Sequence, residues 1–462
     1  MSRKNLAALA LAVLACVLLA TQALAAIPIQ HWTQASGAGV WFVPSPTLPI
    51  LDVQIDFDAG DRRDPPQQSG LASATAQMLG KGVAAADGQP ALDESELEEA
   101  WADLAASFDG SASRDRMSFS LRTLTDPKIL PQAVALAARE LGHPSWPEKV
   151  WDREREQWSA AIRESLTRPG TVAARAFRKA VYGSHPYGVE TEPETLERVG
   201  VSDMRDFYAM HVRPCHARVS VVGAISREQA DQLVQQLLAP LAQDAACPEL
   251  PAVPEVAPLT RAEEIRIPFA SAQTHVLIGQ PGYKRDDPAF FALLVGNHIL
   301  GGGGFTSRLT QRVREDRGLS YSVYSAFSPG RHAGAFSISL ETRPDQAGEA
   351  LQVSRDVLDE FVAEGPTDTE LQAAQDNLTG SFPLRLDSNR KLLANVANIA
   401  WNGLPLDYLE HWTDRISAVT REEITQAFQR VLQPQREVTV VVGPDADSVD
   451  TDTAPQSPAP AD

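Results

Sequence analysis

The sequence has few cysteines, an excess of acidic over basic residues and, beyond its first residues, no long hydrophobic run. Only three of the 462 residues are cysteine, which excludes a disulfide-dense scaffold. Acidic residues outnumber basic ones by 60 to 41, and the resulting net charge of −19 argues against binding to nucleic acid or to anionic membrane surfaces. No apolar run after the N-terminal segment is long enough to cross a bilayer, so no membrane span is expected.

The first 25 residues have the pattern of a secretory signal peptide. Arg3 and Lys4 precede the apolar run "LAALALAVLACVLLA", and "ALA" at 23–25 is a small-residue cleavage site. A lipid anchor on Cys16 is the alternative, but the apolar run continues past that cysteine to Leu19. We therefore predict cleavage after Ala25 and a periplasmic location.

Cys215 and Cys247 remain once the signal peptide is removed. Cys215 precedes the strand-like "ARVSVVGAI", and Cys247 follows the helix-like "SREQADQLVQQLLAPL". The end of such a helix returns toward the start of the strand, so a disulfide is geometrically reasonable in an oxidising compartment. The sequence leaves open a disulfide or two free buried thiols, and two cysteines at this spacing do not form a zinc knuckle.

The common catalytic motifs are missing. None of the nine histidines belongs to an H-E-x-x-H or H-x-x-E-H motif, and neither G-x-S-x-G nor a phosphate-binding G-x-x-x-x-G-K-[ST] occurs. The glycine-rich "LGGGGFTSRL" at 300–309 follows a helix rather than a strand, which disfavours a nucleotide site. We interpret it as the end of one helix and the start of the next, capped by Thr306 or Ser307.

An internal repeat is the strongest organisational signal. The stretch "LDVQIDFDAGDRRDPP" resembles "THVLIGQPGYKRDDPA", and their glycines, Gly60 and Gly282, are 222 positions apart. The stretch "RPCHARVSVVGAI" resembles "QPQREVTVVVGPD", and Gly223 and Gly443 are 220 positions apart. Two distant landmarks with nearly one offset indicate a duplicated domain.

The repeat divides the mature chain into two similar domains. We predict an N-terminal domain at 26–245, a proline-rich linker at 246–262, a C-terminal domain at 263–445 and a disordered acidic Pro/Ala-rich tail at 446–462. Alternating strands such as "RMSFSLRTL" mix with amphipathic helices, whose starts carry the capping boxes Ser226–Gln229 and Thr420–Glu423. The expected fold class is α+β, with a mixed sheet in each domain covered by helices on one face.

The first strand, "DAGDRRDPP", "GLASATAQMLGKG" and the two-domain repeat together resemble the pitrilysin (M16) family of zinc peptidases across essentially the whole mature chain. Active members of that family carry H-x-x-E-H on the helix that follows Gly-x-Ala. The resemblance places the first histidine at Ser73, the general base at Ala76 and the second histidine at Gln77, and it aligns the third zinc ligand with Glu164. A lone carboxylate does not hold zinc, so no metal is expected in this chain. His185, in the family-like "GSHPYG", is not expected to be a ligand.

The C-terminal domain departs less from the family. The stretch "SRLTQRVREDRGLSYSVYSAF" matches a family motif whose arginine and tyrosine, here Arg314 and Tyr321, contact substrate. The resemblance implies that Tyr321 donates its hydroxyl to an oxyanion and that Arg314 holds a substrate carbonyl or C-terminus. Without the resemblance, Arg314 would be a solvated helix-end arginine and Tyr321 the first residue of an alternating strand.

Some short two-domain members of the family are heterodimers in which one chain carries H-x-x-E-H and the other the Arg/Tyr pair. The resemblance therefore implies a non-metal subunit of a periplasmic zinc peptidase, with zinc in an H-x-x-E-H-bearing partner and an extended peptide as substrate. The edge strand that would correspond to peptide binding is expected near "GSASRDRMSFS". The alternative is a peptide-binding or scaffold protein without proteolysis. An independent peptidase with another nucleophile is disfavoured because no base–nucleophile motif occurs. The sequence leaves open the partner's identity, the peptide preference and self-association.

Overall fold

The computed structural model describes residues 27–241 and 247–444, so the predicted signal peptide (1–25) and the whole predicted tail (446–462) lie outside the described residues. The N-terminal half contains a six-stranded mixed sheet with the order β1-β2-β6-β3-β5-β4. Its strands are β1 (Gln30–Thr33), β2 (Gly39–Pro44), β3 (Ile50–Phe57), β4 (Ser107–Ala112), β5 (Met117–Leu124) and β6 (Arg218–Gly223). β2 and β6 are parallel, and the other neighbouring pairs are antiparallel.

The C-terminal half contains a five-stranded mixed sheet with the order β7-β11-β8-β10-β9. Its strands are β7 (Glu263–Pro268), β8 (Thr274–Pro281), β9 (Ser320–Phe327), β10 (Ala335–Thr342) and β11 (Val438–Gly443). Only β7 and β11 are parallel. Each half thus has its own mixed sheet, as the α+β prediction requires.

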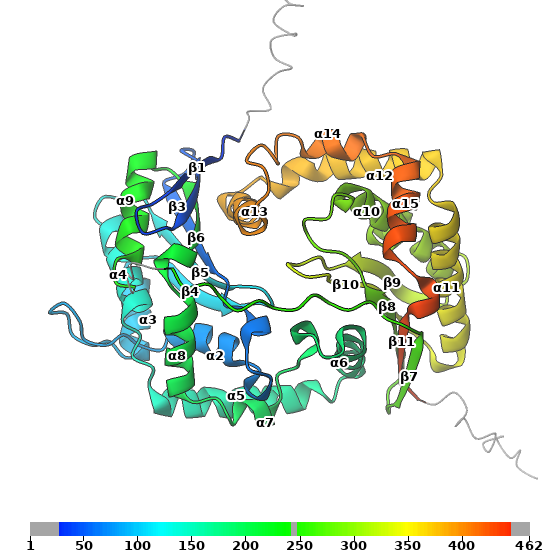
Figure 1. Ribbon diagram of the computed structural model, residues 1–462, viewed down its shortest axis with the longest axis horizontal. Helices are drawn as coiled ribbons and strands as arrows, with labels where there is room; N and C mark the ends of the chain where they lie inside the picture. Colours follow the sequence, from blue (N-terminus) through cyan, green and yellow to red (C-terminus); the bar gives the residue numbers. More distant parts are fainter. Residues whose placement is uncertain (1–26, 242–246, 445–462) are drawn as a thin grey trace, which may run out of the picture.

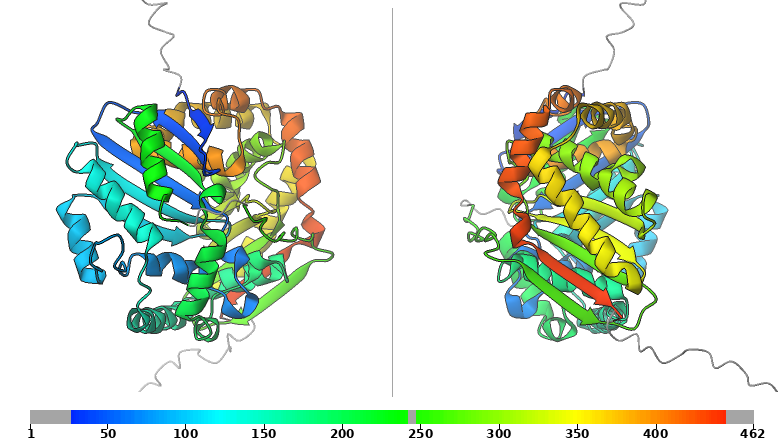
Figure 2. Two further views of the ribbon diagram at one scale, coloured as in Figure 1. Left: turned by 60° about the vertical axis from the view of Figure 1, so that its left-hand side comes forward. Right: turned by 90° about the vertical axis from the view of Figure 1, so that its right-hand side faces the viewer.

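Helices cover the face of each sheet that points away from the other half (Figure 1). In the N-terminal half they are α2 (Leu71–Leu79), α3 (Glu94–Asp103), α4 (Leu130–Gly142), α5 (Glu148–Ser165), α7 (Pro193–Leu196), α8 (Val201–His211) and α9 (Arg227–Leu238). In the C-terminal half they are α10 (Phe290–Asn297), α11 (Ala347–Glu364), α12 (Asp368–Ser381), α14 (Trp412–Ser417) and α15 (Arg421–Val431). The right-hand view of Figure 2 shows α11, in yellow, lying across the outer face of its sheet.

The packed faces follow from strand alternation. Met117, Phe119 and Leu121 of β5 are buried with the helices of the N-terminal half, as the pattern of "RMSFSLRTL" predicts. Both predicted capping boxes are present, at Ser226–Gln229 before α9 and at Thr420–Glu423 before α15. Within the described residues, no helix combines the length and apolar character needed to cross a membrane.

Two helices lie on the sheet of the opposite half. α6 (Pro169–Tyr182) packs on β8 and β11 of the C-terminal sheet, whereas α13 (Asn389–Asn402) packs on β6 and β3 of the N-terminal sheet (Figure 1). The two helices begin 220 positions apart, the same offset that separates β6 from β11. The sequence repeat is therefore a structural repeat, and the two repeats exchange one helix each.

The proline-rich segment between the halves is fixed at several points. A disulfide joins Cys215, just before β6, to Cys247 in this segment, which resolves the alternative that the sequence left open. Beyond the disulfide, Arg63 donates to the carbonyl oxygen of Pro251 at 2.5 Å, and the Nε2 atom of His185 lies 2.9 Å from the carbonyl oxygen of Pro254. The segment crosses from one half to the other (Figure 1).

Candidate functional site

Helix α2 is the helix that the sequence resemblance aligns with the zinc-binding helix of active M16 peptidases. It starts after Gly70, whose φ of 102° favours glycine, and seven of its nine residues are buried. The Asp64 carboxylate accepts hydrogen bonds from the backbone N–H groups of Gly70 at 2.8 Å and Ala72 at 2.9 Å. This carboxylate satisfies N–H groups that the first turn of a helix leaves free. Small residues and Met78 let the helix pack closely under the sheet.

The three positions of the lost motif make contacts without metal chemistry. The Ser73 hydroxyl donates to Asp61 Oδ1 at 2.9 Å, and the Ala76 side chain is buried. The Gln77 amide donates to Glu154 Oε2 at 2.9 Å. The Gln77 amide nitrogen therefore contacts the Glu154 carboxylate directly. A zinc site would instead need an imidazole at position 77 and a metal ion between the two side chains.

Two cationic side chains share the charge of Glu154. Lys81 Nζ lies 3.5 Å from one oxygen of Glu154 and 2.6 Å from Glu94, and the Arg153 guanidinium lies 2.6 Å from Glu154. These contacts neutralise the carboxylate that could otherwise bind a cation. The pKa of Lys81 is raised because its hydrogen bonds and ion pairs with the two glutamates outweigh the opposing effect of burial.

Glu154, not Glu164, is the carboxylate that faces α2, which corrects the alignment of the third ligand. Glu164 lies at the far end of α5, its side chain is 68% exposed, and it forms an i,i+4 ion pair with Arg168. Ten residues of helix separate the two glutamates, a distance of roughly 15 Å. One face of α5 is buried and contains Glu154 between Trp151 and Ile162. A carboxylate within this apolar stripe was the sequence signal that would have identified Glu154.

Two further carboxylates lie at the start of α2. Burial raises the pKa of Asp61, despite the hydrogen bond from Ser73 and the charge of Arg114. Burial together with the nearby charge of Asp61 raises the pKa of Asp64 well above its usual range. Both groups serve the local fold, because their contacts are with the helix start and with Ser73.

The residues on this face do not fit a zinc site. Among the residues that the structure describes, the one cluster of three potential ligand side chains is Cys215, His216 and Cys247. Both of its cysteines are in the disulfide and supply no thiolate. A catalytic zinc ion needs three protein ligands. The α2 face presents the Ser73 hydroxyl, the Ala76 methyl group and the Gln77 amide, none of which is a usual zinc ligand. They lie beside Glu154, whose carboxylate is already ion-paired.

Arg314 and Tyr321 lie together at the edge of the C-terminal sheet. The guanidinium carbon of Arg314 is 4.8 Å from the ring centroid of Tyr321 and 4.9 Å from that of Phe305. A turn at Gly318, with φ 63°, reverses the chain between the two residues. Tyr321 belongs to the edge strand β9, and its side chain is 81% exposed. The predicted pair is therefore in contact and open to a ligand.

Phe305 was missed by the sequence reasoning. It is 71% exposed and follows the glycine run, in which π-helical backbone spans His298–Gly302 and Gly304 has φ 63°. The expected helix restart is present, because Ser307 Oγ accepts from the N–H of Thr310 at 3.4 Å. A large aromatic residue directly after a glycine run was the available signal. The Arg314 guanidinium thus contacts the rings of both Phe305 and Tyr321, and it also lies 3.3 Å from Glu315.

Helix α2 and strand β9, which carries Tyr321, lie in different halves of the molecule (Figure 1). Within the described part of the chain, no hydrogen bond, ion pair or ring contact joins these two elements.

Comparisons with known proteins identify the family to which the chain belongs. The family model described as "Insulinase (Peptidase family M16)" matches residues 42–193, and the "Peptidase M16 inactive domain" model matches residues 198–378. A crystal structure of a peptidase M16 inactive domain from Pseudomonas fluorescens is 32% identical, with a TM-score of 0.84, and the match covers 90% of this chain and 98% of that one. The chain belongs to peptidase family M16.

Other M16 relatives differ in the activity that their names state. An uncharacterized zinc protease of Streptomyces coelicolor is 29% identical over 83% of both chains. A non-peptidase homolog of Helicobacter pylori is 23% identical over 82% of this chain and 85% of its own. The periplasmic protease PqqL of Escherichia coli shares the fold, with a TM-score of 0.76 at 19% identity over 90% of this chain and 45% of its own.

Proposed function

We propose that this M16 chain is the non-metal subunit of a periplasmic zinc peptidase and supplies Arg314 and Tyr321 to a partner that carries H-x-x-E-H. The observation that carries the proposal is the contrast between the two sites. The α2 face lacks zinc ligands and its remaining glutamate is ion-paired, whereas Arg314 and Tyr321 are stacked and accessible. Tyr321 is highly exposed, and the half-buried Arg314, which also lies 3.3 Å from Glu315, remains beside it where a substrate could reach both.

The chemistry available to this pair is binding and charge stabilisation. The Tyr321 hydroxyl can donate a hydrogen bond to the oxyanion that forms when a peptide carbonyl is attacked. The Arg314 guanidinium can donate two hydrogen bonds to a substrate carbonyl or carboxylate. Zinc, in the partner, would supply the activated water and polarise the carbonyl.

Three observations support the periplasm as the location. The Cys215–Cys247 disulfide is typical of an oxidising compartment. The structural relative PqqL is described as periplasmic, and the N-terminal sequence has the signal-peptide pattern. We also propose the domain boundaries predicted from the sequence, with an N-terminal domain at 26–245, a linker at 246–262 and a C-terminal domain at 263–445.

The test is kinetic and uses the native complex. The chain is purified from its own cell envelope, the partner is identified, and the complex is rebuilt with Tyr321→Phe. Loss of one oxyanion donor typically costs about a hundredfold to a thousandfold in turnover, and that fall is expected with the partner's zinc content unchanged. Tyr324→Phe is the matched control, because Tyr324 lies on the same strand and is 50% exposed.

Arg314→Ala distinguishes substrate binding from assembly. We expect a higher KM for the complex, with the subunit stoichiometry preserved. Wild-type kinetics for both the Arg314 and Tyr321 variants would contradict the proposal. A native preparation in which the chain carries no H-x-x-E-H partner would also contradict it.

The second candidate is a peptide-binding or scaffold protein of the M16 fold without a role in proteolysis. It is favoured by the non-peptidase homolog of Helicobacter pylori, which matches over a similar share of the chain. The free edge of β4 in the N-terminal sheet, within the region predicted for peptide pairing, would be available to either function.

A further inference from the structure

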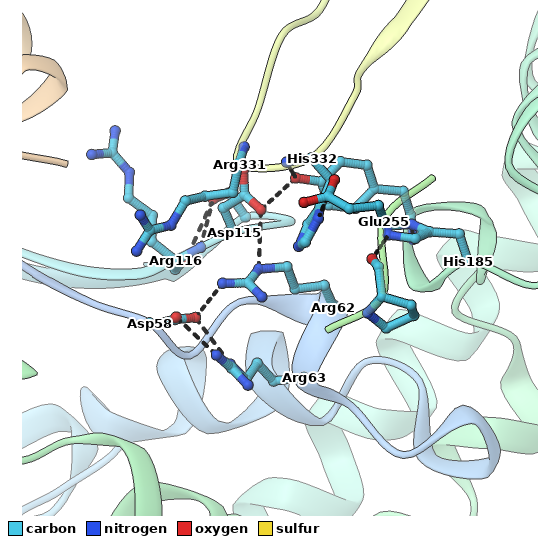
Figure 3. A network of polar contacts seen from close by, with 12 residues as sticks. Asp58, Arg62, Arg63, Asp115, Arg116, His185, Glu255, Arg331 and His332 are labelled. Atoms are coloured by element: carbon cyan, nitrogen blue, oxygen red, sulfur yellow. Dashed lines mark hydrogen bonds and ion pairs between the residues drawn. The ribbon is translucent and has the colours of Figure 1, made fainter. Parts of the chain in front are cut away.

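Arginine side chains gather where the two halves and the linker meet (Figure 3). The five arginines of this junction are Arg62, Arg63, Arg116, Arg218 and Arg331, and its three aspartates are Asp56, Asp58 and Asp115. This local excess of positive charge occurs in a chain whose net charge is −19.

The aspartates already have partners. Asp58 forms ion pairs with Arg62 at 2.5 Å and with Arg63 at 2.8 Å. Arg116 pairs with the buried Asp56 at 3.1 Å. Asp115 contacts Arg62 at 3.1 Å and accepts hydrogen bonds from Tyr187 Oη and from the backbone N–H of Arg331. These contacts join the β4–β5 turn to the β9–β10 turn.

Two guanidinium groups remain without a close carboxylate. Neither Arg218 nor Arg331 forms an ion pair or a side-chain hydrogen bond with any residue in the described ranges 27–241 and 247–444. Their guanidinium carbons lie 5.0 and 5.1 Å from the ring centroid of Trp401, on α13. Burial and the charge of Arg331 lower the pKa of Arg218, although Asp58 and Asp56 lie within electrostatic range.

Both groups line a cavity of about 500 Å³. The cavity lies on the face of the N-terminal sheet that carries Thr33, Gly39 and Arg218, three residues that are neighbours across β1, β2 and β6. The remaining titratable groups of its wall are His31, Asp58, His216 and Glu249, and the wall also contains Trp41 and the disulfide.

We propose that this cavity binds a carboxylate group of a peptide, with Arg218 and Arg331 as the two charged donors. A guanidinium group presents parallel N–H donors that match the two oxygens of a carboxylate. Trp41, in the wall of the cavity, offers apolar surface to the carbon skeleton that bears the carboxylate. The wall includes His31 and Thr33 of β1, an edge strand whose free backbone groups can pair with an extended segment.

The proposed site is complete within this chain and does not depend on a partner subunit or on Arg314 and Tyr321. A bound carboxylate would also reduce the repulsion between the charges of Arg218 and Arg331. Two neighbouring, partly buried like charges destabilise a fold unless something binds them, and unfavourable charge arrangements are typical of binding sites.

The test measures binding to the mature chain by titration calorimetry. Three N-acetylated pentapeptides are compared: Ac-AAGAF with a free C-terminus, the same peptide as its C-terminal amide, and the amide with glutamate in place of the central glycine. We expect binding of the free acid, of the glutamate peptide, or of both, and at least tenfold weaker binding of the neutral amide. The pattern identifies a C-terminal or a side-chain carboxylate as the ligand.

The variants Arg218→Gln and Arg331→Gln should each weaken peptide binding at least tenfold. Arg343→Gln is the control, because Arg343 is a 66% exposed arginine paired only with Asp345 among the described residues. A binding role also predicts that Arg218→Gln leaves the unfolding temperature unchanged or raises it, whereas a structural role predicts a lower one. Equal binding of the neutral amide, unchanged affinity in both arginine variants, or binding of inorganic phosphate but of no peptide would overturn the proposal.

Discussion

At the scale of single residues, the lost zinc site is defined by what now contacts Glu154. The carboxylate that would complete a metal site is instead held by an amide, an ammonium and a guanidinium group, from Gln77, Lys81 and Arg153. These contacts satisfy a buried charge, which would otherwise be costly. Zinc ligands introduced on α2 would therefore have to compete with these contacts for Glu154.

Restoring the motif tests the corrected ligand position. In the variant Ser73→His, Ala76→Glu, Gln77→His, we expect zinc binding that the wild-type chain lacks, measured by elemental analysis after dialysis. Adding Glu154→Gln should abolish that zinc, whereas adding the matched Glu164→Gln should leave it in place, because Glu164 is exposed and distant. Zinc retained without Glu154 and lost without Glu164 would reverse our correction.

Glu140 predicts a pH dependence of stability. It is 1% exposed, accepts a hydrogen bond from Trp101 Nε1 at 3.0 Å, and burial raises its pKa to about 8 from 4.5. Between those values the folded chain keeps a proton that the unfolded chain loses, so the free energy of unfolding falls as pH rises.

We therefore expect Glu140→Gln to raise the unfolding temperature at about pH 8.5 and to change it little at about pH 5. Thermal unfolding followed by circular dichroism at both pH values measures this, with the exposed Glu98→Gln as control. An equal shift at both pH values would show that the effect of the substitution does not come from ionisation.

At the scale of elements, the segment between the halves behaves as a structural part rather than a free tether. The disulfide attaches this segment beside β6. The backbone carbonyl oxygens of Pro251 and Pro254 form hydrogen bonds with the side chains of Arg63 and His185, respectively. Its Glu255 reaches His332 of the C-terminal half at 3.1 Å and Lys284 at 3.0 Å. The segment thus fixes both halves at once.

The disulfide should contribute measurably to stability. It closes a loop with a sequence separation of 32, and the restriction of the unfolded chain by a loop of this size stabilises a protein by roughly 3–4 kcal/mol. We expect the Cys215→Ser, Cys247→Ser double variant to lose about that much free energy of unfolding in urea titrations. A wild-type midpoint that does not move when reductant is added would contradict this expectation.

At the scale of the whole molecule, the exchanged helices make the two halves one cooperative unit. Phe177 and Val181 of α6 are buried together with Val440 and Val442 of β11, across the boundary between the halves. Helix α13 places Trp401 beside the arginines of the N-terminal half. Each sheet therefore depends on a helix from the other half.

We predict a single unfolding transition for the mature chain in differential scanning calorimetry. The variant Phe177→Ala should lower its temperature, because removal of a buried phenylalanine side chain costs about 3–5 kcal/mol. Two separate transitions, with only one of them shifted by the substitution, would show that the halves unfold independently.

The sequence by itself determined the duplicated plan, the mixed sheets and the capped helices, because these follow from local periodicity and from caps. The assignment of α2 to the zinc motif came from the family resemblance and stays a prediction. The sequence also placed Arg314 and Tyr321 in one motif, and their contact follows from a short turn. Their role in catalysis stays a prediction. The tertiary structure alone decided that Glu154 rather than Glu164 faces α2, that Cys215 and Cys247 are joined, and that Arg218 and Arg331 meet beside Trp401. Each of these contacts joins segments that are far apart in the chain, and pairings of that kind depend on how helices and sheets pack rather than on local sequence pattern.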